Sequence, residues 1–135
     1  MRVVIDTNCL IASIPPRSSA YWLYQAFQQQ CFEWLTSNEI LLEYEEQIAA
    51  YYSPKTAEII LKILSIAPNV IYKEAFINWN LIEQDPDDNK FVDLAISVNA
   101  HFLVSNDRHF DVLKTVDFPT LKVVSLEEFR QILQF

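Results

Sequence analysis

Two carboxylates that each follow a short apolar run are the first candidates for chemistry in this sequence. Asp6 comes directly after Val3–Ile5, and Asp107 follows Phe102–Val104 at a distance of two residues. Short β-branched and aromatic runs of this kind indicate buried strands. Ligands bind at the carboxyl ends of the strands of a parallel sheet, so the two carboxylates converge if their strands are neighbours.

A third acid comes from the turn formed by residues 85–89, directly before an expected helix. Asp88 stands three residues before Phe91, which belongs to an apolar helical stripe, so Asp88 should point inward toward the sheet edge. A helix boundary shifted by one or two residues would turn Asp87 inward instead. Asp85 and Asp87 also have an ordinary interpretation as turn and cap residues.

Other acids are placed less well by helical geometry. Glu43 and Glu45 both flank the apolar stripe of one expected helix, and spacing alone does not choose between them. A lone glutamate on an amphipathic helix more often lies on a solvated face. Asp93 lies five residues beyond Asp88, about 140° further round its helix, and is expected at the solvated surface.

Converging carboxylates repel one another unless a cation is present, and sites made of oxygen ligands suit Mg²⁺ or Mn²⁺. Such a site can activate water and hold a scissile phosphate without a nucleophilic side chain. His101 and His109, the only histidines, have no Ser or Cys partner in a recognisable nucleophile setting, and we assign them no role. The hydroxyl of Ser105 is expected to bond to a carboxylate or to a metal-bound water.

Composition limits the classes of protein to consider. A chain of 135 residues fits one domain spanning residues 1–135, and the absence of glycine excludes Gly-rich phosphate loops. The net charge of -8 is opposite to that of a general nucleic-acid binder, although bound cations would reverse the local sign. Cys9 and Cys31 are expected to be buried reduced thiols.

The elements that must position the acids alternate along the chain. Strands are predicted at residues 3–5, 70–72, 102–104 and 121–124, and helices at about 19–30, 38–52, 54–66, 88–99 and 126–133. The first two strands are thus separated by a helix-rich insertion. The alternation predicts an α/β fold with a mainly parallel central sheet. No apolar run is long enough to cross a membrane and no signal peptide is apparent, so a cytoplasmic location is expected.

These residues resemble the PIN-domain family, in particular the toxins of bacterial toxin–antitoxin systems that are related to VapC. The resemblance spans nearly the whole chain. It rests on four segments in the family's order: Val4-Ile5-Asp6-Thr7-Asn8, Ser37-Asn38-Glu39-Ile40-Leu41-Leu42-Glu43, Asp85-Pro86-Asp87-Asp88-Asn89-Lys90-Phe91 and Leu103-Val104-Ser105-Asn106-Asp107.

The resemblance implies a three-layer α/β/α fold and a Mg²⁺- or Mn²⁺-dependent endoribonuclease that acts on RNA, forms a homodimer and is inhibited by a cognate antitoxin protein. It chooses Glu43 over Glu45 as the helix acid. The catalytic and metal-binding set that it implies is Asp6, Glu43, Asp88 and Asp107, with polar support from Thr7, Asn8 and Ser105. Serine at position 105 replaces the threonine common in the family, and this keeps the hydroxyl.

Two other interpretations remain. A strand-end Asp followed by Thr is also similar to haloacid-dehalogenase-type phosphatases, but Asn8 stands where those enzymes have a second aspartate. The stronger alternative is a non-catalytic PIN-like module that binds a basic partner protein. It is favoured by the acidic net charge and by the few basic residues expected near the site, which are Arg2, Arg17, Lys90 and Arg108.

Overall fold

The computed structural model describes all residues 1–135 and contains one five-stranded sheet in which every strand pairs in parallel with its neighbours. The spatial order is β3-β2-β1-β4-β5. The strands are β1 (Arg2–Ile5), β2 (Glu33–Thr36), β3 (Val70–Tyr72), β4 (Phe102–Val104) and β5 (Val123–Val124). The expectation of a mainly parallel α/β sheet is therefore confirmed.

The first strand occupies the centre of this sheet. Val4 pairs with Leu35 of β2 on one side and with Leu103 of β4 on the other. Val3, Val4 and Ile5 are fully buried, as both faces of a central parallel strand must be. The strand order changes direction at β1, and the crevice beyond such a point is where open α/β sheets bind ligands.

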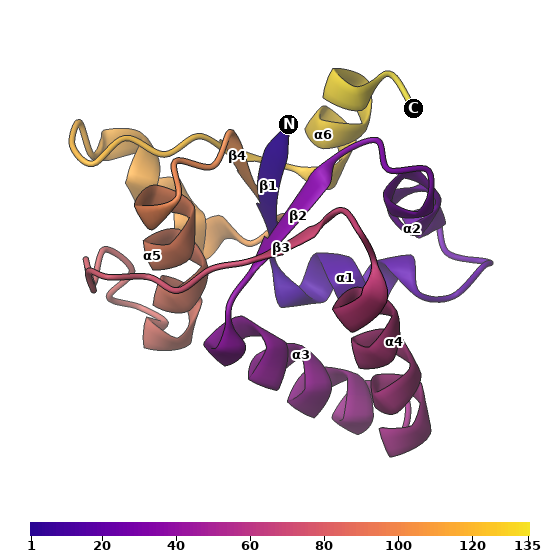
Figure 1. Cartoon of the computed structure of the whole chain (residues 1–135). Coiled ribbons are helices and arrows are strands. Elements are labelled where there is room, and N and C mark those ends of the chain that lie inside the picture. Colours follow the sequence, from indigo (N-terminus) through magenta and orange to yellow (C-terminus); the bar gives the residue numbers. More distant parts are fainter.

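Helices cover both faces of the sheet, which makes it the middle of three layers. In Figure 1, α5 lies on one side of the strands and α2 and α6 lie on the other. The helix α3 packs against α1, α4 and α5. The bounds are α1 (Thr7–Ser13), α2 (Tyr21–Gln28), α3 (Asn38–Tyr51), α4 (Pro54–Ile66), α5 (Asn89–Ser97) and α6 (Leu126–Leu133), with the 3-10 helices η1 (Pro86–Asp88) and η2 (Arg108–Thr115).

The long helices begin where the sequence provides a cap. The hydroxyl of Ser37 accepts the backbone N–H of Ile40 at the start of α3, and Ser53 does the same for Thr56 in α4. Ile40, Tyr44 and Ile48 of α3 are fully buried, as their spacing predicts. Tyr51, expected to continue this stripe, is 70% exposed because the helix ends there, beyond the edge of the core.

One strand and one α-helix were not predicted, and both lie in the first third of the chain. The helix-rich insertion expected between the first two predicted strands contains β2, which pairs with β1. Residues directly after Asp6 form α1, which packs against α2 and α3. The predicted strand at residues 121–124 is shorter in the structure and covers only Val123–Val124.

Turns in this glycine-free chain use amide side chains where the backbone adopts a positive φ. Gln30, Asn80, Asn99 and Gln134 have φ values of 58°, 53°, 57° and 56°. Asparagine tolerates this region better than most residues with a Cβ atom. Asn99 lies just beyond α5, and Gln134 is the C-cap of α6.

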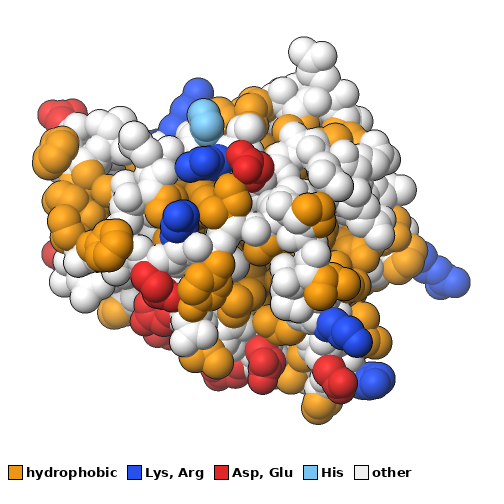
Figure 2. Space-filling model, viewed as in Figure 1, with side chains coloured by type: hydrophobic (Ala, Val, Ile, Leu, Met, Phe, Trp, Pro, Cys, Tyr) orange, Lys and Arg blue, Asp and Glu red, His pale blue; other side chains and the backbone are white.

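Lys and Arg side chains do not form one continuous patch on the face of the molecule that Figure 2 shows. Figure 2 shows Lys and Arg side chains in separate groups, and hydrophobic side chains gathered where the segments after β3 and before β5 lie in Figure 1. Exposed hydrophobic residues of these segments include Phe76, Ile77 and Phe118. Cys9 is buried as expected, but Cys31 is exposed because it lies in the turn between α2 and β2. None of the helices has the length and apolarity required to span a bilayer.

Candidate metal centre

Asp6 and Asp107 lie together at the carboxyl ends of β1 and β4. The backbone N–H of Asp6 donates to the carbonyl of Val104 at 3.0 Å, which holds Asp6 beside the end of β4. The hydroxyl of Ser105 donates to Oδ2 of Asp6 at 2.8 Å and accepts the backbone N–H of Asp107 at 3.0 Å. One hydroxyl therefore fixes the carboxylate of Asp6 and the backbone of Asp107.

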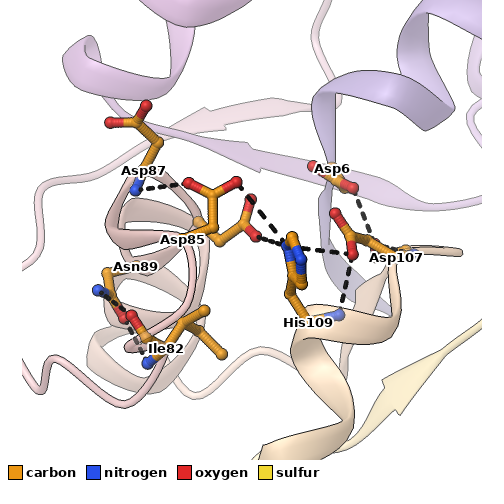
Figure 3. A network of polar contacts seen from close by, with 9 residues as sticks. Asp6, Ile82, Asp85, Asp87, Asn89, Asp107 and His109 are labelled. Atoms are coloured by element: carbon orange, nitrogen blue, oxygen red, sulfur yellow. Dashed lines mark hydrogen bonds and ion pairs between the residues drawn. The ribbon is translucent and has the colours of Figure 1, made fainter.

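Asp88 approaches this pair from the start of α5, and the ring of His109 lies between them. Nδ1 of His109 is 3.3 Å from Oδ2 of Asp88, 3.4 Å from Oδ1 of Asp107 and 3.8 Å from Oδ2 of Asp85. Figure 3 shows the His109 ring between Asp85 on one side and Asp107 on the other. Ligand atoms of Asp85, Asp88 and His109 all lie within 4.8 Å of one another.

Burial and crowding make the ionised forms of two of these acids costly. Burial raises the pKa of Asp6 from 3.8 to about 6, against the opposing effect of its hydrogen bond from Ser105. The pKa of Asp88 rises from 3.8 to about 7, mainly through burial and then through the charges of Asp6, Asp85 and Asp107. Raised pKa values of neighbouring carboxylates mark a candidate functional site.

Glu43 reaches the same region from α3, but its carboxylate is already engaged. Nζ of Lys90 lies 2.6 Å from Oε1 of Glu43, and the hydroxyl of Thr7 donates to Oε2. Lys90 and Thr7 are the second and first residues of α5 and α1, so this contact ties three helices together. The negative charge of Glu43 raises the pKa of Asp6, which indicates that the two carboxylates are near each other.

The donors present fit a hard divalent cation. A cavity of about 200 Å³ is lined by Asp6, Asn8 and Asp107, and it offers room for an ion with part of its water shell. Lys90 pairs with Glu43, and no Lys or Arg side chain pairs with Asp6, Asp88 or Asp107. Carboxylate oxygens with uncompensated negative charge are what Mg²⁺ and Mn²⁺ prefer.

Comparison with protein families gives a match to the PIN domain over residues 2–109, which covers most of the chain and all of the acids described above. The chain belongs to the PIN-domain family. Comparison with curated protein sequences gave no significant match.

Solved structures share the PIN fold at low sequence identity. A chain of the VapBC2 complex from Rickettsia felis, bound to a DNA fragment from its promoter, superposes with a TM-score of 0.65 at 20% identity, covering 93% of this chain and 98% of that one. A chain of DNA-bound VapBC from Salmonella typhimurium gives 0.62 at 17% identity, with coverage of 93% and 98%. VapC20 of Mycobacterium tuberculosis, a toxin that cleaves the sarcin–ricin loop, gives 0.59 at 13%, with coverage of 81% and 92%.

The PIN domain places most of the acids singled out from the sequence at one sheet edge. Asp6 is 4% exposed and Asp88 is 8% exposed, whereas Asp87 and Glu45 are exposed and point away from the core. The geometry thus favours Asp88 over Asp87 and Glu43 over Glu45. Asn8 is exposed and lines the small cavity between Asp6 and Asp107.

Basic residues contribute less to this edge of the PIN domain than the sequence suggests. Arg2 pairs with Glu33 at the opposite, amino-terminal end of β1, so it lies away from the acids. Lys90 is the basic residue in contact with one of the candidate ligands, Glu43. Arg108 is exposed on η2, next to His109.

One expectation about a side chain near the site was wrong, and one contact was not expected. Asp93 is buried, not solvated, because Oδ1 accepts the backbone N–H of Trp79 from a segment that crosses the outer face of α5. His109 contacts three carboxylates, although no role was assigned to it. The sequence did not predict these contacts, because they depend on a 3-10 turn that carries the ring back toward Asp88. This turn begins with a hydrogen bond from the His109 backbone N–H to Oδ1 of Asp107 at 2.9 Å.

Asn89 holds the segment beside the site of the PIN domain in place. The backbone N–H of Ile82 donates to Oδ1 of Asn89 at 2.9 Å, and Nδ2 of Asn89 donates to the carbonyl of Ile82 at 3.0 Å, as Figure 3 shows. Both residues are buried. One side chain therefore satisfies both backbone polar groups of a residue that leads into the acidic turn.

Replacing Asn89 with alanine should lower the free energy of unfolding by about 1–3 kcal/mol, because a buried N–H and a buried carbonyl lose their partners. Urea unfolding followed by far-ultraviolet circular dichroism measures this change. The control is Asn78→Ala, at an exposed asparagine next to Trp79. Its free energy of unfolding should stay within about 0.5 kcal/mol of the wild-type value. Equal stability of the two variants would contradict the assigned role of Asn89.

Proposed function

We propose that this PIN domain is a Mg²⁺- or Mn²⁺-dependent endoribonuclease that hydrolyses RNA phosphodiesters. One observation carries the proposal: Asp6, Asp88 and Asp107 lie at the edge where the strand order of a parallel sheet changes direction, and Nδ1 of His109 contacts both Asp88 and Asp107. The hydroxyl of Ser105 is held by Asp6 and by the backbone of Asp107, and no histidine pairs with it, so hydrolysis by an activated water is the chemistry that these donors support best.

Each side chain has a distinct role in this proposal. Asp6, Asp88 and Asp107 would hold the cation, and Ser105 keeps the Asp6 carboxylate oriented through its 2.8 Å hydrogen bond. A bound Mg²⁺ or Mn²⁺ would supply Lewis acidity for the scissile phosphate and lower the pKa of an attacking water. Asn8 supplies a polar group to the wall of the same small cavity.

Glu43 is the fourth acid of the proposed site, and its position depends on Lys90 and Thr7. Lys90 and Thr7 fix its carboxylate in the metal-free protein. A bound cation would repel the Lys90 ammonium and compete with it for Glu43. Glu43 would then be available as a ligand or to orient water, and Lys90 would be available to contact RNA phosphate. Thr7 retains Glu43 at the site through its hydroxyl.

The biological role that we propose is that of a toxin paired with a cognate antitoxin. The structural relatives include VapBC complexes and a toxin that cleaves the sarcin–ricin loop. A partner segment that carries Arg or Lys would enter the negative pocket and displace the cation. We propose in addition that the protein acts in the cytoplasm as a homodimer, whose mass light scattering would measure.

A second function is favoured by the charge of the molecule. The net charge is -8, and Lys90, the Lys or Arg side chain that pairs with a candidate ligand, neutralises Glu43. A non-catalytic PIN-like module that binds a basic partner protein would have the same properties. Such a module would bind the product of the neighbouring gene but leave RNA intact.

The two functions are separated by incubating the purified protein with a mixed RNA pool with Mn²⁺, and with Mn²⁺ followed by excess EDTA. The nuclease should produce discrete fragments in the first reaction and none after chelation. Co-expression with the neighbouring gene product should suppress the fragments. If the RNA stays intact in Mn²⁺ and the neighbouring gene product co-purifies stably, the nuclease proposal is wrong and the binding module is the function.

A further inference from the structure

A second, larger cavity opens beside the carboxylates. It has a volume of about 460 Å³ and lies between residues 81–84 and the helix η2, within the range of about 300–1,000 Å³ typical of small-molecule pockets. His109 lines this cavity, and its Nδ1 is 3.3 Å from Asp88 and 3.4 Å from Asp107. The cavity and the carboxylate cluster therefore share one wall.

The wall combines apolar surface with a few polar groups. Leu81, Ile82 and Val112 provide the apolar part, and the amide of Gln84 offers both a donor and an acceptor. Arg108 is the permanent cation of the lining and is exposed at its rim. Nucleobases are bound by this combination, since their faces need apolar contact and their edges need hydrogen-bond partners.

Both sides of the cavity are held by the core of the molecule. The segment 81–84 is fixed by the two hydrogen bonds between Ile82 and Asn89. The helix η2 is anchored by Phe110 and Leu113, which are buried. Because Asn89 follows Asp88 directly in the chain, the cavity keeps a fixed position relative to the carboxylates. A rigid site of this kind loses little entropy on binding.

Starting from the ribonuclease activity proposed above, we infer that this cavity binds the base of a nucleotide adjacent to the scissile phosphate. Arg108 then contacts a neighbouring phosphate at the rim, and Gln84 contacts the edge of the base. The substrate is single-stranded RNA, because a base enters such a cavity only when it is neither paired nor stacked within a helix. The enzyme accordingly prefers certain bases beside the cleavage position.

The test fills the cavity and leaves the carboxylates unchanged. Val112 is 44% exposed, so Val112→Trp is tolerated sterically and places an indole in the cavity. The control is Ile59→Trp, at a residue on α4 that is 48% exposed and lies outside the cavity. Two substrates are compared with Mn²⁺ present: a labelled single-stranded RNA, and bis(p-nitrophenyl) phosphate, a phosphodiester without bases.

Val112→Trp should lower kcat/KM for the RNA by roughly 10-fold, because the indole occupies the space that the base would enter. It should also weaken the base preference at the mapped cleavage sites, and hydrolysis of bis(p-nitrophenyl) phosphate should stay within about twofold of Ile59→Trp. Gln84→Leu provides a second variant, which should change the base preference without filling the cavity. RNA cleavage by Val112→Trp with the rate and site preference of the control would overturn the inference.

A binding measurement distinguishes failure of the nuclease proposal from failure of the base-pocket inference. If the wild type hydrolyses neither substrate, binding of dinucleoside monophosphates is measured by NMR titration with Ca²⁺ present to neutralise the carboxylates. Shifts at residues 81–84 and 108–112 that disappear in Val112→Trp would support a base pocket in a protein that does not cut. The absence of such shifts in the wild type would refute the pocket as well.

Discussion

We expect purified Asp6→Asn protein to cleave RNA on the order of 10²–10³-fold more slowly than the wild type, or not measurably. Asp6 lies between β1 and β4, and its carboxylate faces the small cavity that Asp107 and Asn8 also line. Asparagine keeps the shape and an oxygen that can accept the hydrogen bond from Ser105. The substitution therefore removes the negative charge with little change in packing.

The comparison is made with the labelled RNA over a range of Mn²⁺ concentrations. Glu45→Gln, at an exposed acid on the same helix as Glu43, serves as the control and should cleave at the wild-type rate. Circular dichroism verifies that both variants are folded. Undiminished cleavage by Asp6→Asn would remove Asp6 from the metal centre and, with it, the basis of the proposed mechanism.

The same substitution should stabilise the metal-free protein at neutral pH. The pKa of Asp6 is raised in the folded state from 3.8 to about 6, so the folded protein holds the proton more tightly than the unfolded chain does. The contribution of the Asp6 carboxyl group to the free energy of unfolding is fully present below about pH 4 and is lost as the pH rises through about 6. One pKa unit corresponds to about 1.4 kcal/mol, so the loss is on the order of 2–3 kcal/mol.

Urea unfolding in EDTA at a series of pH values measures this effect. The difference in free energy of unfolding between Asp6→Asn and the wild type should be near zero at pH 4, increase up to about pH 6 and then stay constant. Adding Mn²⁺ should stabilise the wild type more than the variant, because only the wild type keeps the complete site. A variant less stable than the wild type at pH 8 would show that the Asp6 charge is compensated in the metal-free protein.

Much of the fold could be predicted because the strands that precede the acids are short and apolar, and the segments between them have apolar residues at helical spacing. The strands before Asp6 and Asp107 are neighbours in one parallel sheet, as convergence of these acids requires. The strand β2 was missed because Glu33-Trp34-Leu35-Thr36 is short, has no β-branched run and ends directly before Ser37, the cap of α3. Its pairing with β1 is a long-range contact, which local pattern does not contain.

The candidate site was predicted less completely than the sheet. Asp88 is buried, as its place beside the apolar stripe predicts, and the alternative Asp87 is exposed. Helical spacing did not choose between Glu43 and Glu45, and only the resemblance to the PIN-domain family favoured Glu43. The surroundings were not predictable in this way. Whether Glu43 meets Lys90, or the ring of His109 meets Asp88, depends on how separate elements pack, and helical periodicity describes only one element at a time.

Asp93 illustrates the same limit. Its angle round α5 does point away from the stripe formed by Phe91, Leu94 and Ala95, as the sequence indicates. The outer face of that helix is nevertheless covered, because the segment carrying Trp79 crosses it and donates a backbone hydrogen bond at 2.9 Å. A polar residue on the outer face can thus be the anchor of a long loop, and only the tertiary structure reveals this.

The central position of β1 has a consequence for synthesis on the ribosome. The first strand to emerge acquires its second neighbour only when β4 has been made, and the hydrogen bond from Ser105 to Asp6 joins residues 99 positions apart. A nascent chain that has exposed only the first three strands therefore has Asp6 but neither Ser105 nor Asp107. Nearly the whole chain must therefore leave the ribosome before Asp6, Ser105 and Asp107 can come together, so the growing polypeptide lacks the complete carboxylate site.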